Sequence, residues 1–70
     1  MMPLNFADVG ADNIIRKIGG NDEIKKHLET LGFVVGGSVR IVADIGGNII
    51  VDVKGSRVAV SREMAQKILI

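Results

Sequence analysis

SVRIVADIGGNIIVDVKGSRVAV, residues 38–60, is the stretch that decides the fold. Apolar residues alternate with other residues through most of it, which is the period of a half-buried β-strand. Two glycine-containing breaks, at residues 46–48 and 55–56, interrupt the alternation. The stretch therefore predicts an antiparallel meander of three strands with one continuous aliphatic face, formed by Val39, Ile41, Ala43, Ile45, Ile49, Val51, Val53, Val58 and Val60.

The loop length of the first hairpin follows from the need for apolar residues to face one another. A two-residue loop of the glycine pair would set Ile45 opposite Asn48 and Ile41 opposite Asp52, which mixes core with polar and charged groups. A slip of one residue inverts every face of a strand. We therefore predict a three-residue loop, residues 46–48, which pairs Ile45 with Ile49, Ala43 with Val51 and Ile41 with Val53.

The second hairpin is predicted to turn on Gly55 and Ser56, because glycine in the first central position is typical of a type II′ turn. This loop pairs the apolar residues of the last two strands, Val53 with Val58 and Val51 with Val60. In the resulting register, Val42 and Ile50 point away from the core and lie diagonal to each other across the first hairpin. Diagonal neighbours about 7–8 Å apart can form a small surface patch.

A helix is predicted before the meander, over residues 22–31. Its apolar residues recur at i, i+4 and i+7, so they form one buried stripe of Ile24, Leu28 and Leu31. Asn21 or Asp22 can cap the first turn, and Gly32 stands where a left-handed glycine commonly ends a helix.

The remaining elements are short. Residues 13–18 predict a strand with partly apolar faces, after an irregular opening segment. Ser61 is expected to cap a helix over residues 62–67, and residues 68–70 to form a closing strand. So short a helix is not stable alone, so it must pack on the sheet. Together these elements predict a mainly β fold with two short helices, in a single domain of residues 1–70.

The composition of the 70 residues excludes several classes of protein. There is no cysteine and one histidine, which rules out disulfide frameworks, zinc ribbons and thiolate-held iron–sulfur clusters. The formal net charge is +1 and two residues are aromatic, whereas nucleic-acid binders normally show a basic excess or stacking aromatics. No apolar run has membrane-spanning length, and the opening residues lack a signal peptide's basic start. We therefore expect a cytoplasmic protein without nucleic acid or direct membrane insertion.

Two stretches resemble a known family. Residues 27–42, HLETLGFVVGGSVRIV, are similar to the region that marks FeoA, the ferrous iron transport protein A family. The matching residues are Leu28, Leu31, Gly32, Phe33, Gly36 and Val39. Residues 57–70, RVAVSREMAQKILI, are similar to the family's final strand, short helix and closing strand. His27 stands where the family usually has arginine, and Val35 where it usually has proline, but the resemblance covers essentially the whole chain.

The resemblance implies an SH3-like small barrel, in agreement with the element order derived above. It also implies a partner, the cytoplasmic G-domain region of FeoB, which is a membrane GTP-binding ferrous iron transporter. We therefore expect a small, non-enzymatic, monomeric protein that supports ferrous iron uptake by docking on the cytoplasmic side of FeoB. The alternative is a metal-responsive regulatory barrel like the C-terminal domain of iron-dependent repressors, although the sequence shows no DNA-reading helix.

His27 and Glu23 are weak candidates for a metal site. They lie four residues apart on the predicted helix, so both side chains could reach one ferrous ion. No second histidine and no cysteine would complete a tight site, so a solvated histidine is favoured, with no cofactor and at most weak ferrous ion binding. The serines lack a nucleophile motif and the glycine pairs lack the spacing of a phosphate loop. We therefore expect neither catalysis nor GTP binding.

Four apolar residues are the candidates for partner binding: Phe33, Val34, Val42 and Ile50. The first two belong to an apolar run in a predicted loop, where a chain is normally polar unless it packs. Phe33 could plug the end of the barrel or anchor a partner on the surface, and both interpretations stay open at this point.

Overall fold

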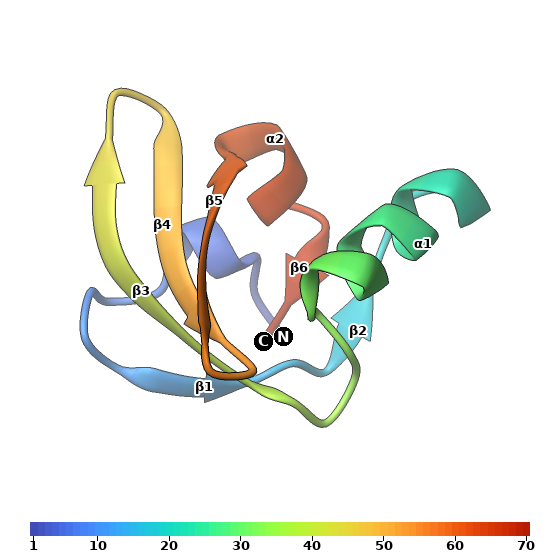
Figure 1. The fold of residues 1–70 in the computed structure, drawn as a ribbon, viewed down its shortest axis with the longest axis horizontal. Coiled ribbons are helices and arrows are strands. Elements are labelled where there is room, and N and C mark those ends of the chain that lie inside the picture. Colours follow the sequence, from blue (N-terminus) through green and yellow to red (C-terminus); the bar gives the residue numbers. More distant parts are fainter.

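The meander predicted from residues 38–60 forms the main sheet. In the computed structural model, which describes residues 1–70, β3 (Ser38–Ile45), β4 (Asn48–Val53) and β5 (Ser56–Ser61) pair in antiparallel order. β1 (Asp12–Ile14) extends this sheet on the other side of β3. Figure 1 shows the three long strands curling together on one side of the molecule. The predicted three-stranded meander and the mainly β fold with two short helices are confirmed.

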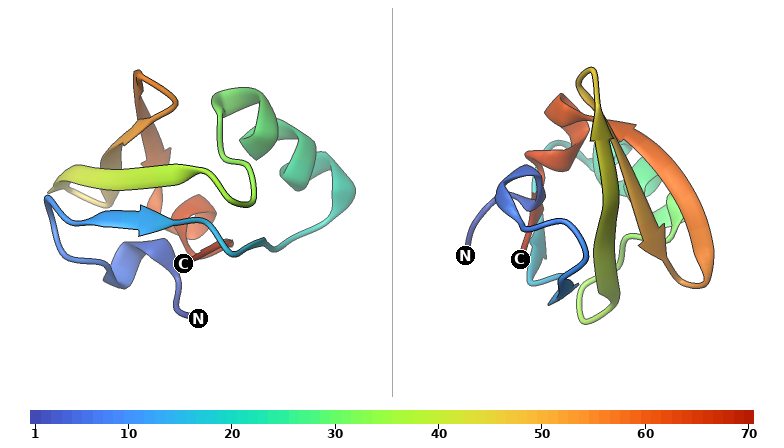
Figure 2. Two further views of the ribbon diagram at one scale, coloured as in Figure 1. Left: turned by 90° about the horizontal axis from the view of Figure 1, so that it is seen from below. Right: turned by 90° about the vertical axis from the view of Figure 1, so that its left-hand side faces the viewer.

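A second, two-stranded ladder includes the C-terminal strand, and the N-terminal residues pair with the same strand. β2 (Lys17–Ile18) pairs with β6 (Ile68–Leu69), and Pro3 forms an isolated bridge to the same strand. The amide of Met2 donates to the carbonyl of Ile70 at 3.0 Å, and the reverse bond measures 2.9 Å. The two termini therefore lie side by side, as Figures 1 and 2 show. A 3₁₀ turn, η1 (Leu4–Phe6), and α2 (Arg62–Ala65) complete this part of the fold.

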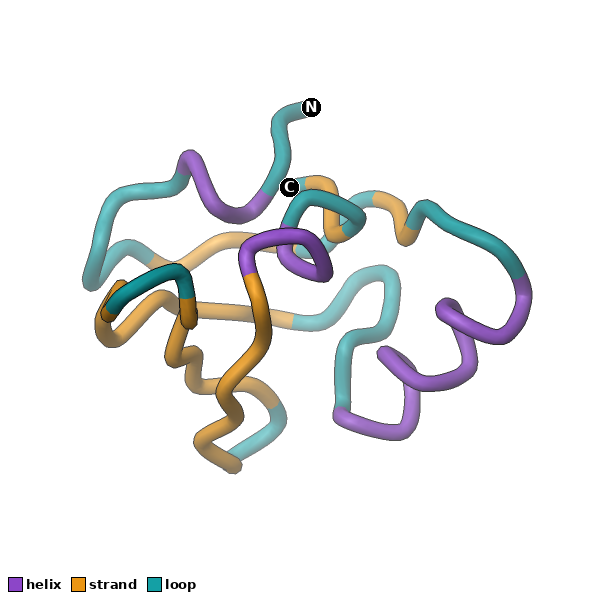
Figure 3. The backbone as a smooth tube through the Cα atoms, turned by 90° about the horizontal axis from the view of Figure 1, so that it is seen from above, coloured by secondary structure: helices purple, strands orange, loops and turns teal.

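The predicted helix is present as α1 (Asp22–Leu31). The side-chain oxygen of Asn21 accepts a hydrogen bond of 2.9 Å from the amide of Ile24, so Asn21 is the N-cap. Gly32 ends the helix with φ 110°, a left-handed conformation that favours glycine. In Figures 1 and 3, α1 lies at the end of the molecule opposite the β3–β4 hairpin. Both helix boundaries were therefore predicted from local capping signals.

The core lies between the main sheet, α2 and the joined ends of the chain. Its buried residues are all apolar and come from nearly every element: Leu4, Ile15, Leu28, Phe33, Val39, Ile41, Ile49, Val51, Val53, Val60, Ala65 and Ile68. Ile24 and Leu31 pack against this cluster beside Leu28. The predicted stripe of α1 is thereby confirmed.

The strand predicted over residues 13–18 is divided in two. β1 ends at Ile14 and β2 begins at Lys17. Between them, the amide of Ile15 donates to the carbonyl of Gly37 and the amide of Arg16 donates to the carbonyl of Leu69. The chain thus crosses from one ladder to the other while staying extended, which places Ile15 in the core.

The predicted register of the β3–β4 hairpin is wrong. The loop has two residues, so Ile45 lies opposite Asn48 and Asp44 opposite Ile49. Gly46 and Gly47 both have positive φ, 57° and 87°, as a type I′ turn requires. This turn matches the right-handed twist of the strands, which favours it over a longer loop.

A β-bulge reconciles the short loop with an apolar core. The register shifts between Ile41 and Ala43, so Val42 is an extra residue without its own place in the ladder. Beyond it, Ile41 faces Val51 and Val39 faces Val53, and all four are buried. Ile45, which we expected in the core, is 65% exposed. In an uninterrupted ladder the two-residue loop would have inverted the faces of the strand, which is why a three-residue loop was predicted.

The predicted register of the β4–β5 hairpin is also wrong, by two residues. Its turn consists of Lys54 and Gly55, so Val51 pairs with Val58 and Ile49 with Val60. A shift of two residues keeps every side chain on its expected face. Val60 is accordingly buried, and Val58 packs against the core.

The tight β4–β5 turn holds one non-glycine residue in a strained backbone conformation. Lys54 is the single non-glycine residue with positive φ, at 49°. Because this conformation is unfavourable for residues with a Cβ atom, we expect Lys54→Gly to raise the free energy of unfolding by about 0.5–1 kcal/mol, measured by urea denaturation. Gly55→Ala is the opposite case, because φ is 73° and no atom lies near the added Cβ. It should lower stability; a loss of stability in Lys54→Gly would contradict the expectation.

Candidate functional site

A groove of about 450 Å³ lies beside α1. One side is formed by α1, a second by β2 with the residue before it, and a third by the loop that follows α1. We call it the helix groove, and its lining residues are Arg16, Lys17, Ile18, Lys25, Glu29, Phe33, Val34 and Val35.

Backbone hydrogen bonds fix the three sides of the helix groove relative to one another. The amide of Phe33 donates to the carbonyl of Leu28 at 3.0 Å, which ties the loop to the end of α1. The amide of Gly36 donates to the carbonyl of Ile15 at 2.8 Å, and the amide of Ile15 donates to the carbonyl of Gly37 at 2.9 Å. These bonds hold the loop against the strand segment that precedes β2, so the groove is preformed.

The apolar loop residues predicted for partner binding differ in exposure. Phe33 is 1% exposed, so of its two expected roles the structure supports the core role, and Phe33 as a surface anchor is corrected. Its large ring packs in the core among the other buried residues. Val34 is half-buried and Val35 is 64% exposed. Val34 therefore stays a candidate, and Val35 is a groove residue that the sequence analysis did not select.

Positive charge dominates the helix groove. Arg16, Lys17 and Lys25 are exposed and face one acidic residue, Glu29. None of these four side chains takes part in an ion pair or side-chain hydrogen bond, although the three other arginines of the chain are all ion-paired. Sequence reasoning missed these basic residues because they lie on different elements, and only the folded chain brings them together.

A second apolar region lies on the outer side of the main sheet. Ala43, Ile50 and Ala59 form a row across three strands, because Ile50 pairs with both alanines. Ile45 lies two residues further along β3. We call these four residues the sheet face. Ile50 is half-buried within it, so the predicted position of Ile50 outside the core is confirmed.

Val42 does not lie diagonal to Ile50 in a regular ladder, as was predicted. It is the extra residue of the β3 bulge and is half-buried. The bulge displaces the register by one residue, so Ala43 takes the place beside Ile50 instead. Val42 therefore borders the sheet face without belonging to its central row.

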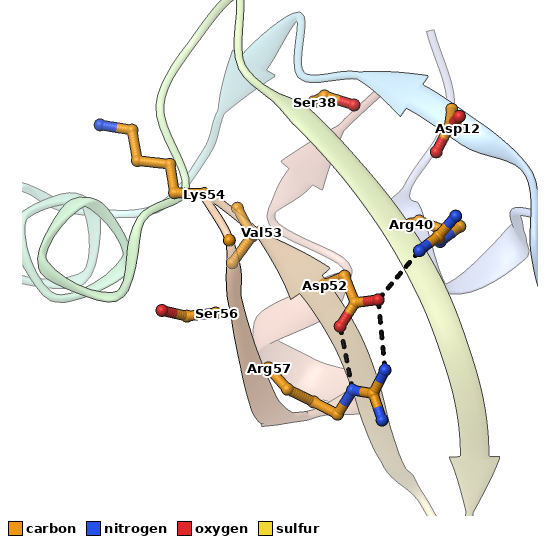
Figure 4. A pocket seen from close by; sticks show the side chains of 9 residues that line it. Asp12, Ser38, Arg40, Asp52, Val53, Lys54, Ser56 and Arg57 are labelled. Atoms are coloured by element: carbon orange, nitrogen blue, oxygen red, sulfur yellow. Dashed lines mark hydrogen bonds and ion pairs between the residues drawn. The ribbon is translucent and has the colours of Figure 1, made fainter.

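A row of alternating charges crosses the sheet next to the sheet face. Asp12, Arg40, Asp52 and Arg57 are successive ladder partners on four strands. Figure 4 shows both arginines pointing toward Asp52, and the bonds measure 2.9 Å from Arg57 Nε and 3.1 Å from Arg40 Nη2. With Lys54 and its neighbours, the row lines a shallow depression of about 640 Å³.

These ion pairs make the row a structural feature of the sheet. The hydrogen bonds from Arg57 and Arg40 lower the pKa of Asp52 below its ordinary value of 3.8, and Asp52 raises the pKa of Arg57. A lowered carboxyl pKa stabilises the fold above the ordinary value and loses that contribution as pH falls through the folded-state value. Asp44 is likewise paired, with Arg62 at 3.6 Å. The depression thus holds a carboxylate already satisfied by two arginines.

The two candidate metal ligands lie on the solvent side of α1. His27 and Glu23 are both exposed. No group of three or more His, Cys, Asp or Glu side chains is placed to hold a metal ion. The pair therefore has no third protein ligand, which a tight site for a divalent transition metal would need.

We expect His27→Ala to leave the affinity for Fe²⁺ unchanged, because an exposed pair on one helix turn offers no closed coordination shell. Anaerobic calorimetry with Fe²⁺ would measure this, with Glu23→Gln as the matched variant. Sub-micromolar binding that disappears in His27→Ala would overturn the expectation.

The comparisons with known proteins identify the family. No helix combines the length and apolar character needed to cross a bilayer. A model of the FeoA domain matches residues 2–70. The chain belongs to the FeoA family. A candidate Fe²⁺ transport protein A of Methanocaldococcus jannaschii is 31% identical over 70 residues, which is 100% of this chain and 85% of the relative.

Solved FeoA structures have the same fold. The crystal structure of an iron uptake regulatory protein, FeoA, has a TM-score of 0.87 and 25% identity, covering 96% of this chain and 89% of that one. Stenotrophomonas maltophilia FeoA, complexed with zinc and described as a prokaryotic SH3 domain protein, has a TM-score of 0.83 and 29% identity, covering 99% and 88%. The expected SH3-like barrel is therefore confirmed.

The same fold is found as part of longer proteins. A manganese-dependent transcriptional repressor has a TM-score of 0.82 with 17% identity, and the match covers 94% of this FeoA-family chain but 38% of the repressor. At this identity the likeness shows the fold alone.

Proposed function

We propose that this FeoA-family chain supports ferrous iron uptake as a non-enzymatic, cytoplasmic docking module for FeoB, the GTP-binding iron transporter. The observation that carries the proposal is the family match, which extends from residue 2 to residue 70. The relative from M. jannaschii is a candidate Fe²⁺ transport protein. The S. maltophilia protein has been suggested to act as a ferrous iron transport activating factor.

The surface of the chain supports a docking role. The helix groove and the sheet face each combine exposed or half-buried aliphatic side chains with nearby charges. Apolar centres with polar rims are typical of protein–protein interfaces. The sheet face, with Ile50 at its centre and Val42 at its border, is our candidate for contact with the transporter.

The test is direct binding between the purified chain and FeoB from the same organism. Full-length FeoB in lipid nanodiscs and its isolated cytoplasmic domain would be titrated separately, with duplex DNA as the control. We expect saturable binding of the chain, as a monomer, to both forms of FeoB and none to DNA. Absence of FeoB binding together with salt-dependent DNA binding would contradict the proposal.

A regulatory barrel is the second candidate, because a transcriptional repressor contains the same fold. A regulatory role would require the chain to act on, or within, a DNA-binding protein. The same titration separates the two functions, since only the transport role predicts binding to FeoB.

A further inference from the structure

We propose that the helix groove binds an extended acidic peptide segment that carries a branched aliphatic side chain. The proposal concerns the groove of Arg16–Ile18, α1 and Phe33–Val35, and it does not depend on docking to FeoB. It follows from three properties of the groove, which are its uncompensated charge, its apolar lining residues and its position between a strand and a helix.

The charge of the helix groove sets the sign of its ligand. Three basic side chains and one acidic side chain give its lining residues a formal charge of +2, which exceeds the +1 of the whole chain. No ion pair or side-chain hydrogen bond neutralises Arg16, Lys17 or Lys25. By contrast, the arginines of the sheet are held by Asp52 and Asp44. The groove thus brings together three basic side chains that no ion pair occupies.

The apolar residues of the groove favour a ligand that has an apolar side chain as well as negative charge. Val35 is 64% exposed, and Ile18 and Val34 are half-buried between the basic residues. Phe33, which is 1% exposed, also lines the groove. An aliphatic side chain of the ligand would remove these surfaces from water, and acidic residues on either side of it would meet the basic rim.

The shape of the groove favours an extended chain. Its volume of about 450 Å³ is well above that of one small anion, and it lies between a strand and a helix. β2 is hydrogen-bonded to β6 on one side only, so its other edge has no strand partner. Single-stranded nucleic acid fits less well, because it needs an aromatic stacking surface and the ring of Phe33 is 1% exposed.

Titration of the isotope-labelled chain with synthetic peptides, followed by amide chemical shifts in NMR, tests the proposal. The probe is the capped peptide Asp-Glu-Leu-Asp-Ile-Glu. Two controls vary one property each, with lysine replacing every acid or serine replacing both aliphatic residues. We expect saturable shifts at residues 16–18, 25–29 and 33–35 with the probe, and at least about tenfold weaker binding for either control.

Neighbouring lysines on α1 provide a matched pair of variants. Lys25 lines the groove, whereas Lys26 is exposed outside it. Lys25→Glu should weaken binding of the probe peptide about tenfold, and Lys25→Gln should weaken it by less. Lys26→Glu should weaken it by less than about twofold. Both positions are exposed, so all three variants should keep the amide spectrum of the folded chain.

Several outcomes would overturn the proposal. One is no binding of the acidic probe at millimolar concentration, and another is equal binding of the lysine peptide. Shifts centred on the sheet face, or equal losses in Lys25→Glu and Lys26→Glu, would place binding elsewhere. Tighter groove binding by an oligonucleotide than by the acidic peptide would assign the groove to nucleic acid. None of these outcomes bears on FeoB binding, so the two proposals can fail separately.

Discussion

Phe33→Ala is expected to lower the free energy of unfolding by about 3–5 kcal/mol, measured by urea denaturation. The ring is 1% exposed and is the largest fully buried side chain. Its removal loses the transfer free energy of the ring and leaves a cavity beside the helix groove. Native domains have about 0.05–0.15 kcal/mol of stability per residue, so this loss is comparable with the stability of the whole chain. Much of the variant should be unfolded.

A matched pair of substitutions separates burial from position in the loop. Phe33→Leu should cost less than Phe33→Ala, because leucine refills part of the cavity. Val35→Ala, two residues along the same loop, should change stability by about 0.5 kcal/mol or less, since Val35 is 64% exposed. Similar losses of stability for Phe33→Ala and Val35→Ala would show that Phe33 does not pack in the core.

The elements that were predicted correctly are those specified by local chemistry. α1 has its polar N-cap, its apolar stripe and a glycine in the left-handed conformation directly after it. Ser61 likewise caps α2, accepting a hydrogen bond of 3.2 Å from the amide of Met64. α2 ends at Ala65, two residues before the predicted end, because Lys67 already leads into β6. Such signals act within one helical turn, so a sequence shows them without knowledge of the fold.

The predicted strand registers were wrong because register depends on residues that are distant in the sequence. Alternation predicts which face of a strand is apolar, but it does not reveal where a bulge interrupts the ladder. At Val42 the bulge lets the type I′ turn coexist with a buried Ile41. At the β4–β5 hairpin, the predicted and the observed registers bury the same face of the strands. The observed register has the turn at Lys54 and Gly55, which requires a left-handed conformation of Lys54.

Only part of the helix groove was predicted, because its other residues are distant from one another in the sequence. Apolar residues in a loop indicated Phe33 and Val34, and both line the helix groove. The basic residues that give the groove its charge come from β2, the residue before it, and α1. No sequence period links Arg16 to Lys25, so their proximity follows only from the way in which the loop after α1 returns to Ile15.

The sheet face offers the sharpest test of docking on the transporter. Ile50→Lys should weaken binding of the chain to FeoB by about 2 kcal/mol, or about thirtyfold, if this residue is the centre of the interface. It sits between Ala43 and Ala59, whose small side chains leave it as the main apolar surface of the row. Because Ile50 is half-buried, the substitution should cost about 1 kcal/mol of stability and leave the chain folded.

Variants elsewhere on the surface show whether the effect is local. Ile14→Lys places the same charge on an exposed isoleucine of β1, in the same sheet, and should leave FeoB binding unchanged. Val42→Lys, at the border of the sheet face, should weaken binding like Ile50→Lys. The comparison with Lys25→Glu then locates the interface, because a loss confined to that variant would move docking from the sheet face to the helix groove. Unchanged affinity for FeoB in both Val42→Lys and Ile50→Lys would rule out the sheet face as the docking surface. A lysine at the centre of a buried apolar contact must lower the affinity, because its charge would lose its hydration.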